Sequence, residues 1–232
     1  MKYKIKALIA QAMNVKNPKR VLKNTIKSHI LDGVALTKFL FWIKKNNNNK
    51  LTEIQASRKL EKFRRLNSDY LFPSFKTISG SGPNGAIIHY NVNKKTNRKI
   101  NKKDIYLCDS GGHYKYGTTD VTRTICFSEP NKKIKDIFTM VLKGHIAVVN
   151  TNLNKHKYGK IIDLRARRSL RSANMDYPHG TGHGVGYFLN VHEGPQAISK
   201  SNKITLKKGM ILSNEPGSVS YTHLTLPTSD LV

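Results

Sequence analysis

Acidic residues and cysteines are scarce in this chain of 232 residues, which holds 41 lysines and arginines but only 14 aspartates and glutamates and two cysteines. Cys108 and Cys126 lie in predicted strands, where we expect small buried thiols and neither a disulfide nor a redox role. The longest apolar run, Phe39 to Ile43, is far shorter than the roughly 20 residues that cross a bilayer. The basic start, Met1 to Met13, is too poor in apolar residues for a secretion signal. We therefore expect a cytoplasmic protein.

The net charge of +27, taken alone, would suggest a nucleic acid or an anionic membrane as partner. The lysines, however, are spread along the whole chain instead of forming one stripe. They accompany isoleucine and asparagine, as in the run Asn46 to Asn49, and all three residue types have A/T-rich codons. A biased genome explains the charge more simply than a binding site does, so we expect no specific nucleic-acid partner and no membrane association.

Periodicity and capping signals predict two helices before any strand. The segment from Pro18 to Lys45 follows an N-cap signal at Asn17 and has the pattern of a long amphipathic helix. Its apolar residues recur at near-helical spacing: Ile26, Ile30, Val34 and Leu40. Thr52 and Gln55 resemble a capping box, which predicts a second helix through Phe63.

Short strands with turns between them follow the two helices. The predicted strands cover residues 75–79, 86–90, 105–109, 120–127 and 210–214, with a Gly-rich turn at 80–83. Two further helices are predicted over residues 132–149 and 159–173. The sequence therefore predicts an α+β domain whose polar residues of interest lie on strands and their connecting turns.

Two acidic residues, Asp109 and Asp120, stand among apolar residues on neighbouring predicted strands. The turn between them contains glycines, and a hairpin of this length can bring both carboxylates to one end. Acidic side chains are seldom buried without a cation, so we expect positive charge between them. His183 and Glu215 add an imidazole and a third carboxylate, and such mixed ligands suit Mn²⁺, Zn²⁺ or Co²⁺. Each residue alone is weak evidence, because turn-forming aspartates and structural histidines are commoner than metal ligands.

Four blocks, in order along the chain, carry a resemblance to a known family. They are SGSGPNGAIIHY at 79–90, YLCDSGGHYKYGTTDVTRT at 106–124, HGTGHGVGYFLNVHEGP at 179–195 and GMILSNEPG at 209–217. Together they resemble the signature blocks of aminopeptidase P, the Xaa-Pro aminopeptidase branch of the pita-bread metallopeptidases. The resemblance implies an antiparallel sheet flanked by helices and hydrolysis of the N-terminal bond of peptides with proline at the second position. It also implies two divalent metal ions as cofactors, with Mn²⁺ expected first and Zn²⁺ or Co²⁺ as alternatives.

The same resemblance implies roles for seven residues. The implied metal ligands are Asp109, Asp120, His183 and Glu215, with Asp120 bridging both ions. The implied catalytic residues, which would hydrogen-bond the substrate and move protons, are His89, His179 and His192. The alternative for these three histidines is a structural role, in which each imidazole is hydrogen-bonded to the backbone in the core. Four histidines match no motif position and are expected to be structural: His29, His113, His145 and His156.

The resemblance stops at Gly217. The family continues into a hairpin with an Arg-Ile-Glu segment whose glutamate bridges both metals, whereas the residues after Gly217 include no acidic residue before Asp230. We interpret residues 1–217 as a pita-bread catalytic domain that is incomplete at its C-terminus and lacks the family's N-terminal creatinase-like domains. Residues 218–232 are interpreted as a tail from a truncated or chimeric reading frame. The intact parent is compatible with a homodimer.

Two other functions stay open. A prolidase-type Xaa-Pro dipeptidase would share most of these motifs. A non-catalytic pita-bread binding module would explain the missing glutamate, although such proteins usually lose metal ligands one at a time.

Overall fold

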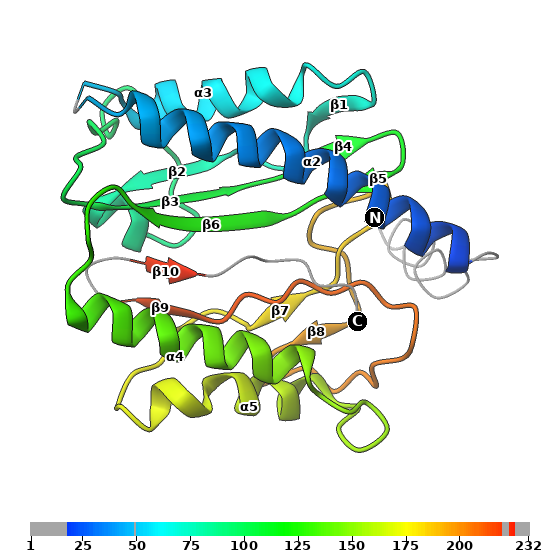
Figure 1. Cartoon of the computed structure of the whole chain (residues 1–232). Coiled ribbons are helices and arrows are strands. Elements are labelled where there is room, and N and C mark those ends of the chain that lie inside the picture. The colour runs from blue at the N-terminus through cyan, green and yellow to red at the C-terminus, as the bar shows by residue number, and fades with distance from the viewer. Residues whose placement is uncertain (1–17, 49, 220–222, 226–232) are drawn as a thin grey trace.

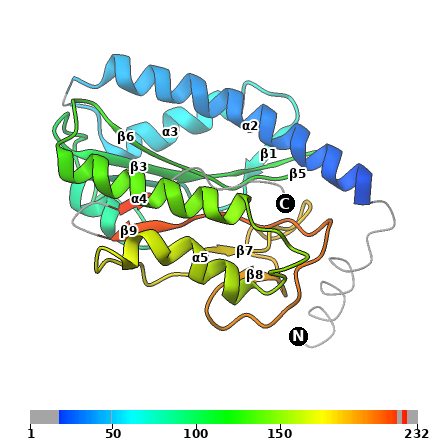
Figure 2. The same cartoon turned by 60° about the horizontal axis from the view of Figure 1, so that its bottom comes forward.

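Helices enclose the strands of this protein on two sides, as its computed structural model shows for residues 18–48, 50–219 and 223–225. Helices α2 (Pro18–Asn46) and α3 (Glu53–Arg64) lie over one side of the strands, and α4 (Lys132–Val149) and α5 (Gly159–Arg171) lie over the other (Figure 1). The rotated view in Figure 2 shows the same arrangement. Among the described residues, no helix is both long and apolar enough to span a membrane.

The helices occur where the sequence predicts them. Helix α2 begins at Pro18, and the predicted N-cap at Asn17 lies outside the described residues. At α3, the Thr52 side chain accepts a hydrogen bond from the Gln55 backbone, and the Gln55 side chain accepts one from the Thr52 backbone. This reciprocal capping box confirms the predicted start of the helix.

The buried face of α2 is not the one that the apolar periodicity indicates. Ile26, Ile30 and Val34 are 41%, 61% and 50% exposed. The buried face instead carries polar side chains in its first half, including Asp32, and apolar ones in its second half. Polar residues can occupy a buried face when other parts of the fold supply hydrogen bonds, and a hydrophobic pattern gives no sign of those partners.

Small antiparallel sheets make up the strand layer. The central sheet has the order β2-β3-β6, and the others are β1-β4-β5, β7-β8 and β9-β10. The strands are β1 (Tyr70–Pro73), β2 (Ile78–Ser81), β3 (Ile105–Ser110), β4 (Gly112–Tyr114), β5 (Gly117–Thr118), β6 (Val121–Cys126), β7 (Gly182–His183), β8 (Ala197–Ile198), β9 (Gly217–Val219) and β10 (His223–Thr225). Strands β3 and β6 confirm the predicted hairpin arms. Both cysteines are free, with Cys108 buried and Cys126 half-buried.

Three strand predictions need correction. Residues 80 and 81, predicted as a turn, continue β2 opposite β3, and the turn begins at Gly82, which has a φ of +57°. No strand forms over residues 86–90, because a 3-10 helix, η1 (Gly82–Ala86), and successive turns occupy this segment. In the predicted strand 210–214, only Leu212 forms a ladder bridge, to Gly184.

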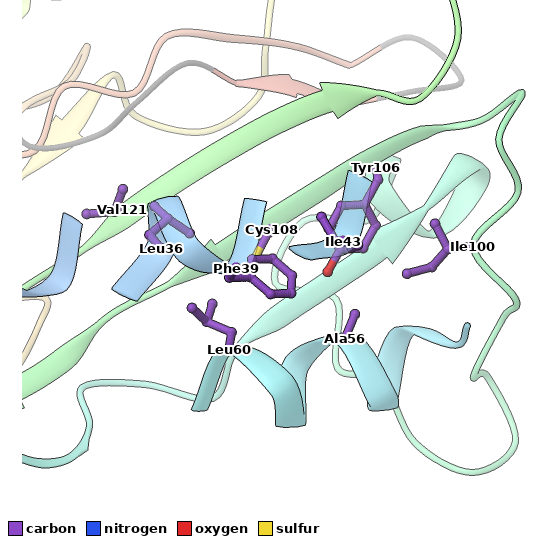
Figure 3. Packing of buried hydrophobic residues seen from close by; sticks show 9 residues of the cluster. All are labelled: Leu36, Phe39, Ile43, Ala56, Leu60, Ile100, Tyr106, Cys108 and Val121. Carbon is purple, nitrogen blue, oxygen red and sulfur yellow. The ribbon is translucent and has the colours of Figure 1, made fainter. Parts of the chain in front are cut away.

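One apolar core lies between α2, α3 and the central sheet (Figure 3). It contains Leu36, Phe39, Ile43, Ala56, Leu60, Ile100, Tyr106, Cys108 and Val121. A second core packs α4 and α5 against β8 and the segment around Leu212: Val148, Ile162, Ala166, Ile198, Leu206 and Leu212. Each side of the molecule therefore has its own packed apolar cluster.

Glu53, the first residue of α3, fixes the segment that replaces the predicted strand. Its fully buried carboxylate accepts hydrogen bonds from the backbone of Ser81 and Arg98 and from the side chains of Asn84 and Tyr90. The spacing of these partners along the chain shows that Glu53 holds both ends of the 82–98 segment. Local capping alone does not predict this role.

Replacing Glu53 with alanine should destabilise the protein by about 2–5 kcal/mol, because each buried donor that loses its acceptor costs about 1–3 kcal/mol. Urea denaturation measures the change. Glu129→Ala is the control, since the Glu129 side chain is 82% exposed. Equal unfolding midpoints for the two variants would show that Glu53 does not hold this segment.

Candidate metal centre

The two aspartates predicted as ligands lie where β3 and β6 run side by side. Asp109 is in β3, opposite Thr122 of β6, and Asp120 immediately precedes β6. Asp120 is buried, and the buried Oδ1 atom of Asp109 has no hydrogen-bond partner among the described residues. Both residues line the same cavity, as the predicted hairpin requires.

His183 and Glu215 come from two segments that run together on the α4–α5 side of the site. The Ser213 backbone N–H donates to the His183 carbonyl at 2.8 Å, and the Glu215 backbone N–H donates to the Thr181 carbonyl at 2.7 Å. A Cβ atom at Gly182 would lie 2.0 Å from the Ser213 carbonyl oxygen. Glycine is therefore required at 182 for this approach.

Three of the four predicted ligands converge closely. His183 Nε2 lies 3.1 Å from Asp120 Oδ2 and 3.0 Å from Glu215 Oε1. One ligand atom from each residue lies within 4.8 Å of the other two. Asp109 is outside this close group, although its carboxyl group interacts electrostatically with all three members.

The orientation of His183 calls for a cation beside it. Its Nδ1 lies 2.9 Å from the Gly184 carbonyl oxygen, which can only accept, so Nδ1 carries a proton. In the neutral imidazole, the Nε2 lone pair would then face two carboxylate oxygens. A proton or a metal ion on Nε2 removes this conflict, and fixing one ring nitrogen by a backbone carbonyl is the usual way to orient a metal-binding histidine.

The pKa shifts of the site residues also indicate a site for a cation. Burial lowers the pKa of His183, but hydrogen bonds and negative charges from Asp120 and Glu215 outweigh it and raise that pKa to about 10. Burial, together with the charges of Asp120 and Glu215, raises the pKa of Asp109 well above its usual range. Metal ligands must be deprotonated, so a divalent cation would displace these protons. The donor set therefore fits divalent metal ions.

The three predicted catalytic histidines line the same cavity, whose volume is about 590 Å³. The His192 ring centroid lies 4.0 Å from that of His183 and 6.2 Å from that of His89. His89 has a φ of +54°, an uncommon and strained backbone conformation for a residue with a Cβ atom. His179 is held through Nδ1, which lies 2.7 Å from the Gly180 carbonyl oxygen.

All seven predicted site residues thus line one cavity, and their individual roles stay predictions. The histidines that matched no motif do not line it: His29, His113, His145 and His156.

Sequence reasoning did not find the residues that hold these side chains in place. On α5, Arg167 donates to the His179 carbonyl at 2.6 Å, and Asp163 accepts from both Arg167 and Thr181. These contacts fix the segment that leads into His183. A usable signal was present, because acidic residues are rare in this chain and Asp163 stands among isoleucine and leucine.

Comparison with known proteins identifies the family. The sequence profile of metallopeptidase family M24 matches residues 23–225. The chain belongs to metallopeptidase family M24. This M24 chain is 43% identical, over 212 residues, to the Drosophila melanogaster protein named Xaa-Pro aminopeptidase, covering 89% of this chain and 35% of that protein. It spans about a third of the length of the curated relatives it matches, with shares of 37%, 34% and 35% for three of them.

Solved M24 structures show the same fold. An X-prolyl aminopeptidase from Caenorhabditis elegans, described as a cytosolic enzyme with a di-nuclear active site, matches with a TM-score of 0.81 and 36% identity, covering 89% of this chain and 34% of that one. A Bacillus anthracis Xaa-Pro dipeptidase matches with a TM-score of 0.79 and 27% identity, covering 90% of this chain and 57% of that one. The pita-bread fold expected from the sequence motifs is confirmed.

Proposed function

We propose that this chain is the catalytic part of an Xaa-Pro aminopeptidase, which hydrolyses the bond between an N-terminal residue and a following proline. The observation that carries the proposal is the convergence of Asp120, His183 and Glu215 on one point of a cavity that three further histidines line. The relatives named for this activity are more similar in sequence than the structural neighbour named as a dipeptidase, which favours the aminopeptidase over the prolidase-type alternative.

We further propose two Mn²⁺ ions as the cofactors, held by Asp109, Asp120, His183 and Glu215. Paired divalent ions of this kind supply a nucleophile from water at neutral pH and polarise the scissile carbonyl. A cytoplasmic location is proposed as well, supported by the description of the C. elegans neighbour as cytosolic. The homodimer of a longer parent, and the absence of nucleic-acid and membrane partners, stay predictions.

The residues of this chain supply binding and proton transfer. His192 is an exposed residue that lines the cavity. Its pKa is lowered by partial desolvation and by the nearby charges of His183 and His89. It is therefore neutral at pH 7 and can accept or donate a proton at the reacting atoms. Apolar side chains beside the polar group provide a wall that fits a pyrrolidine ring: Phe75, Ile78, Ile87, Ile88 and Val191.

Peptide length tests the proposal. With Mn²⁺ present, a tripeptide of the form Xaa-Pro-Xaa should be cleaved at its first bond, and faster than the Xaa-Pro dipeptide. A matched Xaa-Ala-Xaa tripeptide should resist cleavage, and EDTA should abolish activity. Preference for the dipeptide would favour the prolidase-type reading.

The assay should also include a variant of this chain in which the segment after Gly217 is replaced. Residues 218–229 contain no carboxylate. A version in which a hairpin carrying Arg-Ile-Glu replaces residues 218–232 should bind about two Mn²⁺ per chain and cleave faster than the present chain. If neither protein cleaves an Xaa-Pro bond, the binding-module alternative gains and the enzyme proposal fails.

A further inference from the structure

A buried ion pair lies behind the carboxylate side of the candidate metal centre. Asp32 of α2 and Arg64, the last residue of α3, are both fully buried. Arg64 Nε lies 2.6 Å from Asp32 Oδ1, and Arg64 Nη2 lies 3.1 Å from Asp32 Oδ2. Such a pair is weak evidence for stability, because desolvation offsets much of the attraction. Its position suggests a different purpose.

The remaining hydrogen bonds of this pair end beside the two aspartates of the metal centre. Arg64 Nη2 donates to Ser110 Oγ at 2.9 Å, and Ser110 directly follows Asp109. Asp32 Oδ2 accepts from Thr119 Oγ1 at 2.8 Å, and Thr119 directly precedes Asp120. One ion pair therefore contacts a neighbour in sequence of each aspartate.

Hydrogen bonds and close packing fix the position of Thr119. Its backbone N–H donates to the Gly112 carbonyl at 2.9 Å, and its carbonyl accepts from Ser74 Oγ at 2.8 Å. Its Oγ1 accepts from the Gly112 backbone N–H at 2.9 Å. A Cβ atom at Gly111 would lie 1.9 Å from the Thr119 carbonyl oxygen, so the packing leaves no room on that side.

The charge state of Asp32 fixes the direction of these bonds. Burial raises its pKa, but the charge of Arg64 and the hydrogen bonds from Arg64, Thr119 and Tyr114 outweigh burial and hold that pKa below its usual value. An ionised carboxylate only accepts. The Thr119 hydroxyl must therefore donate to Asp32, which leaves its lone pairs for Gly112.

We propose that the Asp32–Arg64 pair is a positioning unit that sets the separation of the Asp109 and Asp120 carboxylates, acting through Ser110 and Thr119, and so determines the affinity of the site for divalent cations. This inference rests on the proposed metal cofactors, but not on the peptide substrate. Neither Asp32 nor Arg64 lines the cavity, so the pair acts through its neighbours.

Thr119→Val tests the proposal, because it keeps the shape of the side chain and removes the hydroxyl that links Asp32 to the Asp120 segment. Calorimetric titration of the full chain with Mn²⁺ alone should show affinity reduced by about 10-fold, the lower end of the range for groups that hydrogen-bond metal ligands directly. Thr119→Ser keeps the hydroxyl and should bind Mn²⁺ within about twofold of the parent chain. Ser110→Ala, which removes the link to Asp109, should also weaken binding and serves if Thr119→Val does not fold.

Leu60→Ala is the control for general destabilisation. Leu60 is fully buried on α3, one turn before Arg64, and belongs to the apolar core. This variant should lower the melting temperature and leave Mn²⁺ affinity unchanged.

The inference is overturned if Thr119→Val binds Mn²⁺ as the parent does, if Leu60→Ala weakens binding equally, or if the parent binds no Mn²⁺ at millimolar concentration. The proposed function fails separately. Weaker Mn²⁺ binding by Thr119→Val, with no Xaa-Pro cleavage by either the unmutated chain or its hairpin-bearing version, would leave the positioning role standing and remove the peptidase.

Discussion

An Asp120→Asn variant should lose peptide cleavage to background and bind neither metal ion tightly. Asp120 is buried, and its Oδ2 lies 3.1 Å from His183 Nε2 at the point where the predicted ligands converge. A carboxylate in a bridging position offsets the charge of two cations, whereas an amide offers a neutral oxygen and an N–H₂ group. The substitution is nearly isosteric, so the loss reports charge and ligation rather than shape.

The same variant should remain folded without metal. Burial and the charge of Glu215 raise the pKa of Asp120 itself, and its hydrogen bond with His183 does not offset them, so the folded protein disfavours the charged form of this side chain. Neutralising Asp120 removes that cost, so the melting temperature in EDTA should not fall. Metal content and kcat/KM are the decisive measurements, and Asp136→Asn, an exposed position on α4, is the matched control. Full metal content in Asp120→Asn, with an ordinary rate, would rule out Asp120 as a bridging ligand.

His192→Ala should give the opposite pattern, with metal retained and kcat reduced by about 10² to 10⁴, the usual range for losing a positioned proton-transfer group. His192 lies beside the metal centre without belonging to its close ligand group. Because its pKa is lowered below 6.5, the neutral form persists to lower pH than for an ordinary histidine. The acid limb of the parent's rate profile that reports His192 should therefore lie below pH 6.5 and disappear in the variant.

His156→Ala is the matched control for this histidine. His156 lies in the connection between α4 and α5, away from the cavity. Its replacement should change neither rate nor metal content. If His192→Ala instead released the metal, His192 would be a ligand and its assigned role in proton transfer would be wrong.

The sequence was most informative where residues interact with close neighbours in the chain. The capping box at Thr52 and Gln55 is a local interaction, and the helix starts where it predicts. The β3–β6 hairpin was readable as well, because two apolar strands joined by a short connection with a glycine-rich turn can pair in few ways. Its arms place Asp109 and Asp120 on one cavity, as expected.

Contacts between distant segments were not readable from the sequence. From the neighbouring sequence, Glu53 is only an acidic residue in the first turn of a helix. Its carboxylate nevertheless accepts hydrogen bonds from residues 28 to 45 positions further along the chain. Asp32 likewise depends on Tyr114 and Thr119, more than 80 residues away. For this reason the buried face of α2 was misjudged, and the segment 86–90 was predicted as a strand although Glu53 holds it in turns.

The candidate site lies between the two cores, so any cation bound there would connect the two sides of the molecule. Asp109 and Asp120 belong to the sheet that packs under α2 and α3, whereas His183 and Glu215 belong to the segments beside α4 and α5. An ion that binds only when both sides are assembled adds RT ln(1 + [L]/Kd) to the free energy of unfolding, about 2.7 kcal/mol at a hundred times Kd. Free metal concentration then becomes a variable of the protein's folding equilibrium as well as of its chemistry.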